Sequence, residues 1–294
     1  MRSVIGLVAA VLLAACGVSN AGNVSTIAVV AGENFWGSIA GQLGDSKVSV
    51  VSIVTDPNAD PHEYESSTAD ARAFADARLV ILDGAGYDDW GQKLLDANPS
   101  SGRQVMNVAE LLGKKQGDNP HFWYSPDYVA RVADKITAEY KSIDPTDASY
   151  FDQQRSHLTT ALQPYLTEIA NIKQHFGNTP VGSTESIFVY MADASGLKLI
   201  SPPEFMEAVA EGNDPPAPSV VEFQDQVSAN EIKVLVYNVQ TVTAVTTNIK
   251  DLAASHHIPK VGVSETMQPP SGVTFQDWQL KQLQTLEQAL KASA

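Results

Sequence analysis

The chain has 294 residues, of which 44% are hydrophobic and 18% are charged, a composition typical of one large globular domain or two of medium size. Asp and Glu number 34 against 19 Lys and Arg, which gives a net charge of -15 and a pI near 4.7. A surface this anionic repels phosphate backbones, so no nucleic-acid partner is expected. Acidity alone does not identify a metal site.

The first 16 residues have the features of a bacterial export signal. Arg2 precedes an apolar run from Val4 to Ala15, a length that suits a signal peptide, whereas a membrane-spanning helix needs roughly 20 residues. The run ends in Leu-Ala-Ala-Cys, which resembles a lipobox whose thiol, Cys16, receives a diacylglyceryl group. We therefore expect a lipoprotein signal peptide over 1–16, a tether over 17–25, and lipid anchoring to the outer face of the cell membrane. An ordinary cleaved signal with an incidental cysteine is the alternative.

Cys16 is the only cysteine, so the mature chain forms no disulfide and offers no thiolate ligand. Residues 26–145 alternate short strands with helices and predict an N-terminal α/β lobe. The expected strands are Thr26–Ala31, Val48–Val54, Leu79–Asp83 and Gln104–Val108, and helices are expected at Trp36–Leu43 and Thr68–Ala77. The strands lack polar alternation, which favours a parallel sheet buried on both faces. A further helix is predicted to start at Ser125, a capping residue followed by Pro126.

A long helix, about Ala148 to Phe176, is predicted in mid-chain, and residues 146–176 are expected to link two lobes. Apolar residues recur in it at spacings of three, four and seven, and Pro164 predicts a kink or a break into two helices. Residues 177–294 are then expected to form a C-terminal α/β lobe. Its expected strands are Pro180–Thr184, Lys198–Ile200, Lys233–Asn238 and Val261–Ser264. Ser201–Ser219 is expected to be an irregular loop or lid, and Phe275–Leu290 an amphipathic helix.

Four residues that bind metals in proteins come directly after, or in the loops after, predicted strands. They are His62, His121, Glu185 and Glu265, two from each half of the chain. Ligands of open parallel sheets bind beyond the carboxyl ends of the strands, so these side chains are candidates to meet between the lobes. Two neutral imidazoles and two carboxylates suit Zn²⁺ or Mn²⁺, with Fe²⁺ also possible.

Each of these residues, taken singly, has an ordinary structural explanation. A histidine after a proline is common in turns, and a glutamate after a strand often begins a helix, where it complements the helix dipole. The remaining histidines are expected to be solvent-exposed or structural: His157, His175, His256 and His257.

Three motifs in chain order resemble those of the metal-binding solute receptors of ABC transporters, the family of zinc and manganese receptors and adhesin-type lipoproteins. They are DPHEYE at 60–65, NPHFW at 119–123 and TESIFVY at 184–190. The resemblance implies two α/β lobes with parallel sheets, joined by a long backbone helix, with one metal ion in the cleft between the lobes. It also implies that His62, His121 and Glu185 are metal ligands.

The chain departs from the family pattern in two places. The family's fourth ligand is usually an aspartate, whereas here the matching residue is Glu265. Zinc-specific members often carry a long His-rich loop before the second histidine motif and a histidine as third ligand; this chain has only residues 113–118 there, and Glu185. Carboxylate oxygens favour Mn²⁺, but Zn²⁺ has the higher intrinsic affinity for such sites, so the residues leave the choice of metal open.

The resemblance implies a monomeric receptor, not an enzyme, that delivers its ion to a permease driven by a separate ATPase. The alternatives are a cell-surface adhesin with the same fold, a metal-dependent hydrolase, and a receptor for an organic solute. A hydrolase needs an open coordination position for water, which four protein ligands would occupy. No arginine of the mature chain lies in the three motifs, which disfavours an anionic organic solute.

Overall fold

The computed structural model of the protein describes residues 26–58, 61–268 and 272–293. Its first sheet has four parallel strands in the order β2-β1-β3-β4. They are β1 (Ile27–Glu33), β2 (Val48–Val54), β3 (Leu79–Leu82) and β4 (Gln104–Asn107). The second sheet is also parallel and has the equivalent order, β6-β5-β7-β8. Its strands are β5 (Pro180–Ser183), β6 (Lys198–Leu199), β7 (Val234–Asn238) and β8 (Lys260–Val263).

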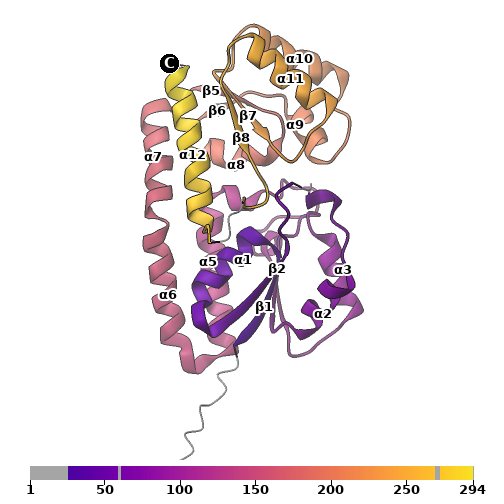
Figure 1. Ribbon diagram of the computed structural model, residues 1–294, viewed down its shortest axis with the longest axis vertical. Helices are drawn as coiled ribbons and strands as arrows, with labels where there is room; N and C mark the ends of the chain where they lie inside the picture. Colours follow the sequence, from indigo (N-terminus) through magenta and orange to yellow (C-terminus); the bar gives the residue numbers. More distant parts are fainter. Residues whose placement is uncertain (1–25, 59–60, 269–271, 294) are drawn as a thin grey trace, which may run out of the picture.

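Figure 1 shows these sheets in two separate lobes, which confirms the predicted α/β class and its two parallel sheets. The central strands β1, β3, β5 and β7 are mostly buried and apolar, and the polar residues of β1, β5 and β7 stand at their carboxyl ends. Val29 and Ala31 of β1 belong to the main core, whereas Val30 between them packs into a smaller cluster with Phe74. Successive side chains of a strand point to opposite faces, so one strand supplies both cores.

In the first lobe, α1 (Asn34–Gly44) packs against α5 (Pro126–Ile143), while α2 (Thr68–Asp76) packs against α3 (Asp89–Ala97). The short α4 (Val108–Leu112) follows β4. As predicted, Ser125 caps α5 by accepting a hydrogen bond from the Tyr128 N–H, with Pro126 at the first helical position. This cap determines where the chain leaves the loop that contains His121.

The mid-chain helix is broken where Pro164 predicted. α6 (Ala148–Ala161) and α7 (Gln163–Phe176) meet at Leu162, and Pro164 lies in the first turn of α7, where no helical partner for its missing N–H is needed. Figure 1 shows α6 and α7 end to end beside both lobes, with α12 (Phe275–Ala292) alongside α7. The lobes are therefore joined by a helical spine that includes the C-terminal helix.

The expectation of an irregular loop or lid over Ser201–Ser219 is wrong. The segment contains α9 (Pro203–Ala210) and the start of α10 (Ala217–Ser228). Prolines that suggested a loop instead lie at the starts of these two helices: Pro202 and Pro216 are the N-cap residues, and Pro203 and Pro218 lie in the first turns, where their fixed φ angle favours helix initiation. The second lobe also contains α8 (Val189–Ala194) and α11 (Ala244–Ser255).

Within the residues that the structure describes, no helix is long and apolar enough to cross a membrane. The predicted signal peptide (1–16) and tether (17–25) lie outside the described residues.

Candidate metal centre

All four predicted metal-binding residues follow the carboxyl ends of strands. His62 lies in the 3₁₀ turn Pro61–Glu63 after β2. His121 directly precedes the turn Phe122–Tyr124, in the connection from β4 to α5 and after the short helix α4. Glu185 and Glu265 come two residues after the ends of β5 and β8, respectively.

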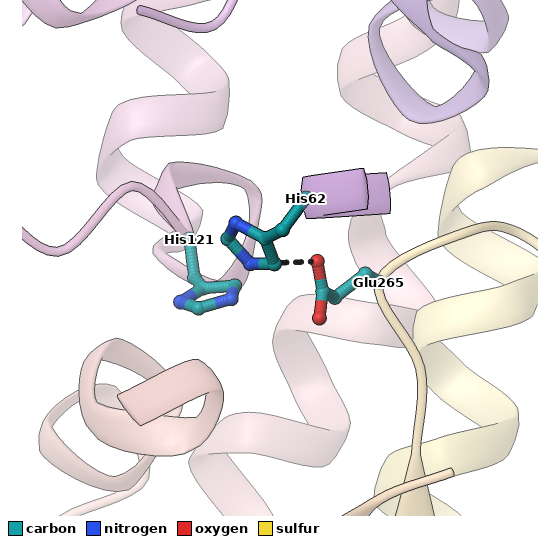
Figure 2. Close-up of side chains that lie close together, drawn as sticks. All are labelled: His62, His121 and Glu265. Atoms are coloured by element: carbon teal, nitrogen blue, oxygen red, sulfur yellow. Dashed lines mark ion pairs between the residues drawn. The ribbon is translucent and has the colours of Figure 1, made fainter. Parts of the chain in front are cut away.

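The structure brings these four residues together between the lobes. One ligand atom each from His62, His121 and Glu265 lies within 4.8 Å of the others, and Figure 2 shows the three side chains converging. Nε2 of His62 is 3.4 Å from Oε2 of Glu265. Nε2 of His121 is 3.7 Å from Oε1 of Glu185, which places the fourth residue beside the cluster. Among the described residues this is the one group of three or more His, Cys, Asp or Glu with such spacing.

Three of the four side chains are shielded from solvent. His121, Glu185 and Glu265 are fully buried, whereas the side chain of His62 is 25% exposed. Burial, with a smaller contribution from His62, lowers the pKa of His121 well below its usual range, so His121 stays neutral. Only the neutral imidazole binds a metal.

Asn119 orients the His121 ring. Nδ1 of His121 is 2.8 Å from Oδ1 of Asn119, a distance at which the ring N–H donates to the amide oxygen. The lone pair then lies on Nε2, which has no hydrogen-bond partner among the described residues and faces Glu185. A histidine held in this way by a second hydrogen bond is typical of metal sites.

Two neutral donors hold the Glu265 carboxylate. Oη of Tyr87 donates to Oε2 at 2.7 Å, and Nδ2 of Asn238 donates to Oε1 at 2.5 Å. The Tyr87 ring also contacts His62 edge-on, with the ring centroids 4.8 Å apart. Burial, followed by the charge of Glu265, raises the pKa of Tyr87 well above its usual range, so the phenol remains a donor.

Sequence analysis did not identify Tyr87 or Asn238. Tyr87 follows β3 and Asn238 ends β7, so the carboxyl-end rule applied to the remaining strands would have suggested both.

A cluster of buried carboxyl groups lies on the first-lobe side of the centre. Glu33, Asp83 and Asp88 are each at most 2% exposed. Asp88 accepts hydrogen bonds from the backbone N–H groups of Asp83 (2.6 Å) and Gly84 (2.8 Å). Burial raises the pKa of Asp88 to about 6. Burial, and then repulsion from Asp88 and Asp83, raises the pKa of Glu33 well above its usual range, so the fold favours the protonated form of Glu33.

A cavity of about 870 Å³ opens beside His62 and is lined by both lobes. Tyr87 and Pro120 line it from the first lobe, and Ser186 and Met206 from the second. Its charged lining residues are all acidic: Asp118, Asp193, Glu207 and Glu211. The cavity therefore connects solvent to the exposed side of His62 through surroundings that favour a cation.

Comparison with known proteins places the chain in a family. A family model described as the periplasmic component A of the zinc-uptake complex matches residues 29–289. The chain belongs to this family. The resemblance found in the three sequence motifs is thus confirmed over nearly all of the described structure.

The curated relatives of this zinc-uptake family member bind different metals. The manganese-binding lipoprotein MntA of Halalkalibacterium halodurans is 26% identical over 153 residues, which cover 49% of this chain and 50% of MntA. The chain therefore matches about half the length of MntA. The high-affinity zinc uptake system protein ZnuA of Bacillus subtilis is 20% identical over 236 residues, which cover 74% of this chain and 72% of ZnuA.

The periplasmic zinc binding protein TroA from Treponema pallidum has the same fold. It superposes with a TM-score of 0.76 at 12% identity, over 92% of this chain and 100% of TroA.

Replacing Tyr87 with Phe tests its hydrogen bond to Glu265. The variant removes one donor from the carboxylate and keeps the ring, so we expect metal affinity to fall by about tenfold, the effect typical of a group that orients a ligand. Titration of the metal-free protein with Zn²⁺ measures this. Tyr140→Phe is the control, because it removes a buried hydrogen bond to the Ala40 carbonyl outside the centre. Equal affinities of the two variants would contradict the expectation.

Replacing Glu33 with Gln tests the raised pKa of Glu33. The pKa of Glu33 is raised in the folded protein, so between the ordinary and the raised pKa the folded chain keeps a proton that the unfolded chain releases. The free energy of unfolding therefore falls as pH rises from the ordinary Glu pKa through the raised one. A neutral amide avoids this loss. We expect Glu33→Gln to raise Tm at about pH 8 and to flatten the decline from about pH 5. The exposed Glu222→Gln on α10 should leave the profile unchanged; a wild-type profile in Glu33→Gln would refute the expectation.

Proposed function

We propose that this protein is an extracytoplasmic solute receptor that captures a divalent transition metal, Zn²⁺ or Mn²⁺, for import by an ABC transporter. The observation that carries the proposal is the convergence of His62, His121 and Glu265 within 4.8 Å, with Glu185 beside His121. Family membership and the zinc and manganese relatives support it. The geometry supports a solute receptor better than a hydrolase, because four protein ligands leave no open position for a reactive water.

In this proposal all four residues bind the ion. The imidazoles of His62 and His121 supply nitrogen donors, and the carboxylates of Glu185 and Glu265 supply oxygen and neutralise the charge of the ion. Buried carboxylates without a cation are costly in free energy, so the ion stabilises the closed arrangement of the lobes. This set of nitrogen and oxygen donors suits both metals. Zn²⁺ has the higher intrinsic affinity, but the metal that is bound in the cell also depends on which metal is available there.

The ion reaches the centre through the cavity beside His62, loses its waters and bridges residues from both lobes. The spine of α6, α7 and α12 limits how far the lobes separate, so opening involves small shifts or loop movements rather than a wide hinge. Affinity falls in acid because protonated histidine does not bind metal. Release occurs on a membrane permease coupled to a separate ATPase, and the receptor acts as a monomer.

Metal titrations of single-ligand variants test the site. Alanine at His62, His121, Glu185 or Glu265 should lower Zn²⁺ affinity by more than about 100-fold, since a lost ligand costs more than a lost orienting group. His157→Ala is the matched control, because His157 is exposed on α6 and outside the cluster. Competition between Mn²⁺ and Zn²⁺ on the wild type ranks the metals. Unchanged affinity in His62→Ala removes His62 from the ligand set, and a wild type that binds neither metal overturns the proposed function.

The membrane anchor is the second part of the proposal. The lipobox at Leu13–Cys16 supports acylation of Cys16, and MntA, a relative, is named a lipoprotein. We expect Cys16→Ser to abolish incorporation of labelled fatty acid and to shift the protein out of the membrane fraction. Ser19→Ala, next to the lipobox, should change neither result. Fatty-acid labelling that persists in Cys16→Ser would refute lipidation at this residue.

A further inference from the structure

A polar stripe on α1 faces Met267 and the first residues of α12. It consists of Asn34, Ser38 and Gln42, which lie four residues apart and therefore share one face of the helix. Ser38 Oγ accepts a hydrogen bond from the Phe275 N–H at 3.0 Å. Gln42 and Gln276 exchange side-chain hydrogen bonds of 2.8 and 3.2 Å. Polar side chains of the first lobe thus form hydrogen bonds with the start of α12.

Asn34 makes the contact nearest to the metal centre. Its Oδ1 accepts from the Met267 N–H at 3.0 Å, and its Nδ2 donates to the Met267 carbonyl at 3.3 Å. The amide therefore pairs with both backbone groups of one residue, as a neighbouring strand would. A carboxylate of the same size could only accept, and alanine could do neither.

Met267 is two residues after Glu265, so this pairing restrains the backbone that presents the carboxylate. Two other first-lobe residues act on the same short segment. Tyr124 donates from Oη to the Ser264 carbonyl at 2.8 Å, and Tyr87 donates to Glu265 itself. Residues of both lobes therefore hold the surroundings of Glu265. From the second lobe, Asn238 donates to its carboxylate and Gln240 accepts from its backbone N–H at 2.8 Å; the first lobe adds the contacts named above.

We propose that Asn34 is a positioning residue for the metal site: by pairing with Met267, it holds Glu265 within reach of His62 and His121. The inference rests on the proposed metal-binding function. Asn34 is not itself one of the four proposed ligands and would affect metal affinity through the position of Glu265. Its physical basis is preorganisation, because a carboxylate already held near the imidazoles loses less conformational entropy when the ion binds.

Asn119 provides a parallel on the other carboxylate of the second lobe. Its Nδ2 donates to the Ser186 carbonyl at 2.8 Å, directly after Glu185. Each glutamate therefore has an asparagine of the first lobe bound to the backbone within two residues of it. Asn34 is the better residue to test, because Asn119 also contacts the His121 ring.

A double-mutant cycle separates positioning from general stabilisation. Asn34→Ala, Glu265→Ala and the double variant are titrated with Zn²⁺, and Tm is measured for each metal-free protein. We expect Asn34→Ala to lower affinity by about tenfold in the wild-type background and to have no further effect once Glu265 is absent. The same loss in both backgrounds would overturn the proposal, because Asn34 would then act without Glu265.

Gln42→Ala is the matched control. It breaks a contact of the same stripe with Gln276, but farther along the chain from Glu265, so it should lower Tm and keep Zn²⁺ affinity within about twofold. Equal affinity losses in Gln42→Ala and Asn34→Ala would also overturn the proposal. If Asn34→Ala does not fold, Asn34→Asp takes its place in the cycle, because it keeps the acceptor for Met267 and loses the donor. A wild type that binds no Zn²⁺ refutes the proposed function, whereas a binding wild type with an unchanged Asn34→Ala refutes the positioning role alone.

Discussion

The structure of this protein depends on buried carboxyl groups that face histidine rings between the two lobes. Glu185 and Glu265 are fully buried, and each has a carboxylate oxygen within 4 Å of a histidine nitrogen, at 3.7 and 3.4 Å. Removal of a carboxylate from water is expensive unless a counter-charge or strong donors replace the solvent. Tyr87 and Asn238 meet part of this requirement for Glu265. In the proposed function a divalent cation meets the rest, which would explain why ionisable groups gather in an interior that a stable fold would otherwise keep apolar.

The acidic residues near the centre fall into two groups, which differ in how far they are removed from solvent. Burial raises the pKa values of Glu33 and Asp88, which opposes the build-up of negative charge on the first-lobe side. The acidic residues that line the cavity are instead close to solvent, where charge costs little and attracts cations. Acidic residues therefore line the open cavity, whereas the raised pKa values oppose ionisation of the buried carboxyl groups of the first lobe.

The helical spine explains how residues from two lobes form one centre. α12 packs on α7 and on β8, and through the stripe on α1 it also contacts the first lobe. Glu265 precedes α12 in the chain, so this candidate ligand of the second lobe lies next to residues that contact the first lobe. Such a scaffold favours a site whose residues already lie close together before an ion binds.

The sequence by itself determined the strands, the helix break at Pro164 and the four candidate ligands. These features depend on short-range rules: apolar runs form buried strands, proline interrupts a helix, and functional side chains follow the carboxyl ends of parallel strands. Proline is common both in loops and at the starts of helices, so the prolines of 201–219 led to a wrong prediction of a loop where two helices begin.

Only the tertiary structure decided which residues contact the candidate ligands and the backbone beside them. Tyr87 lies 178 residues from Glu265, and Asn34 lies 233 residues from Met267. No local pattern connects residues so distant in the chain, because their contact depends on how the two sheets face each other across the spine. The raised pKa of Glu33 has the same origin: it requires burial beside Asp88, which the packing of the first lobe brings about.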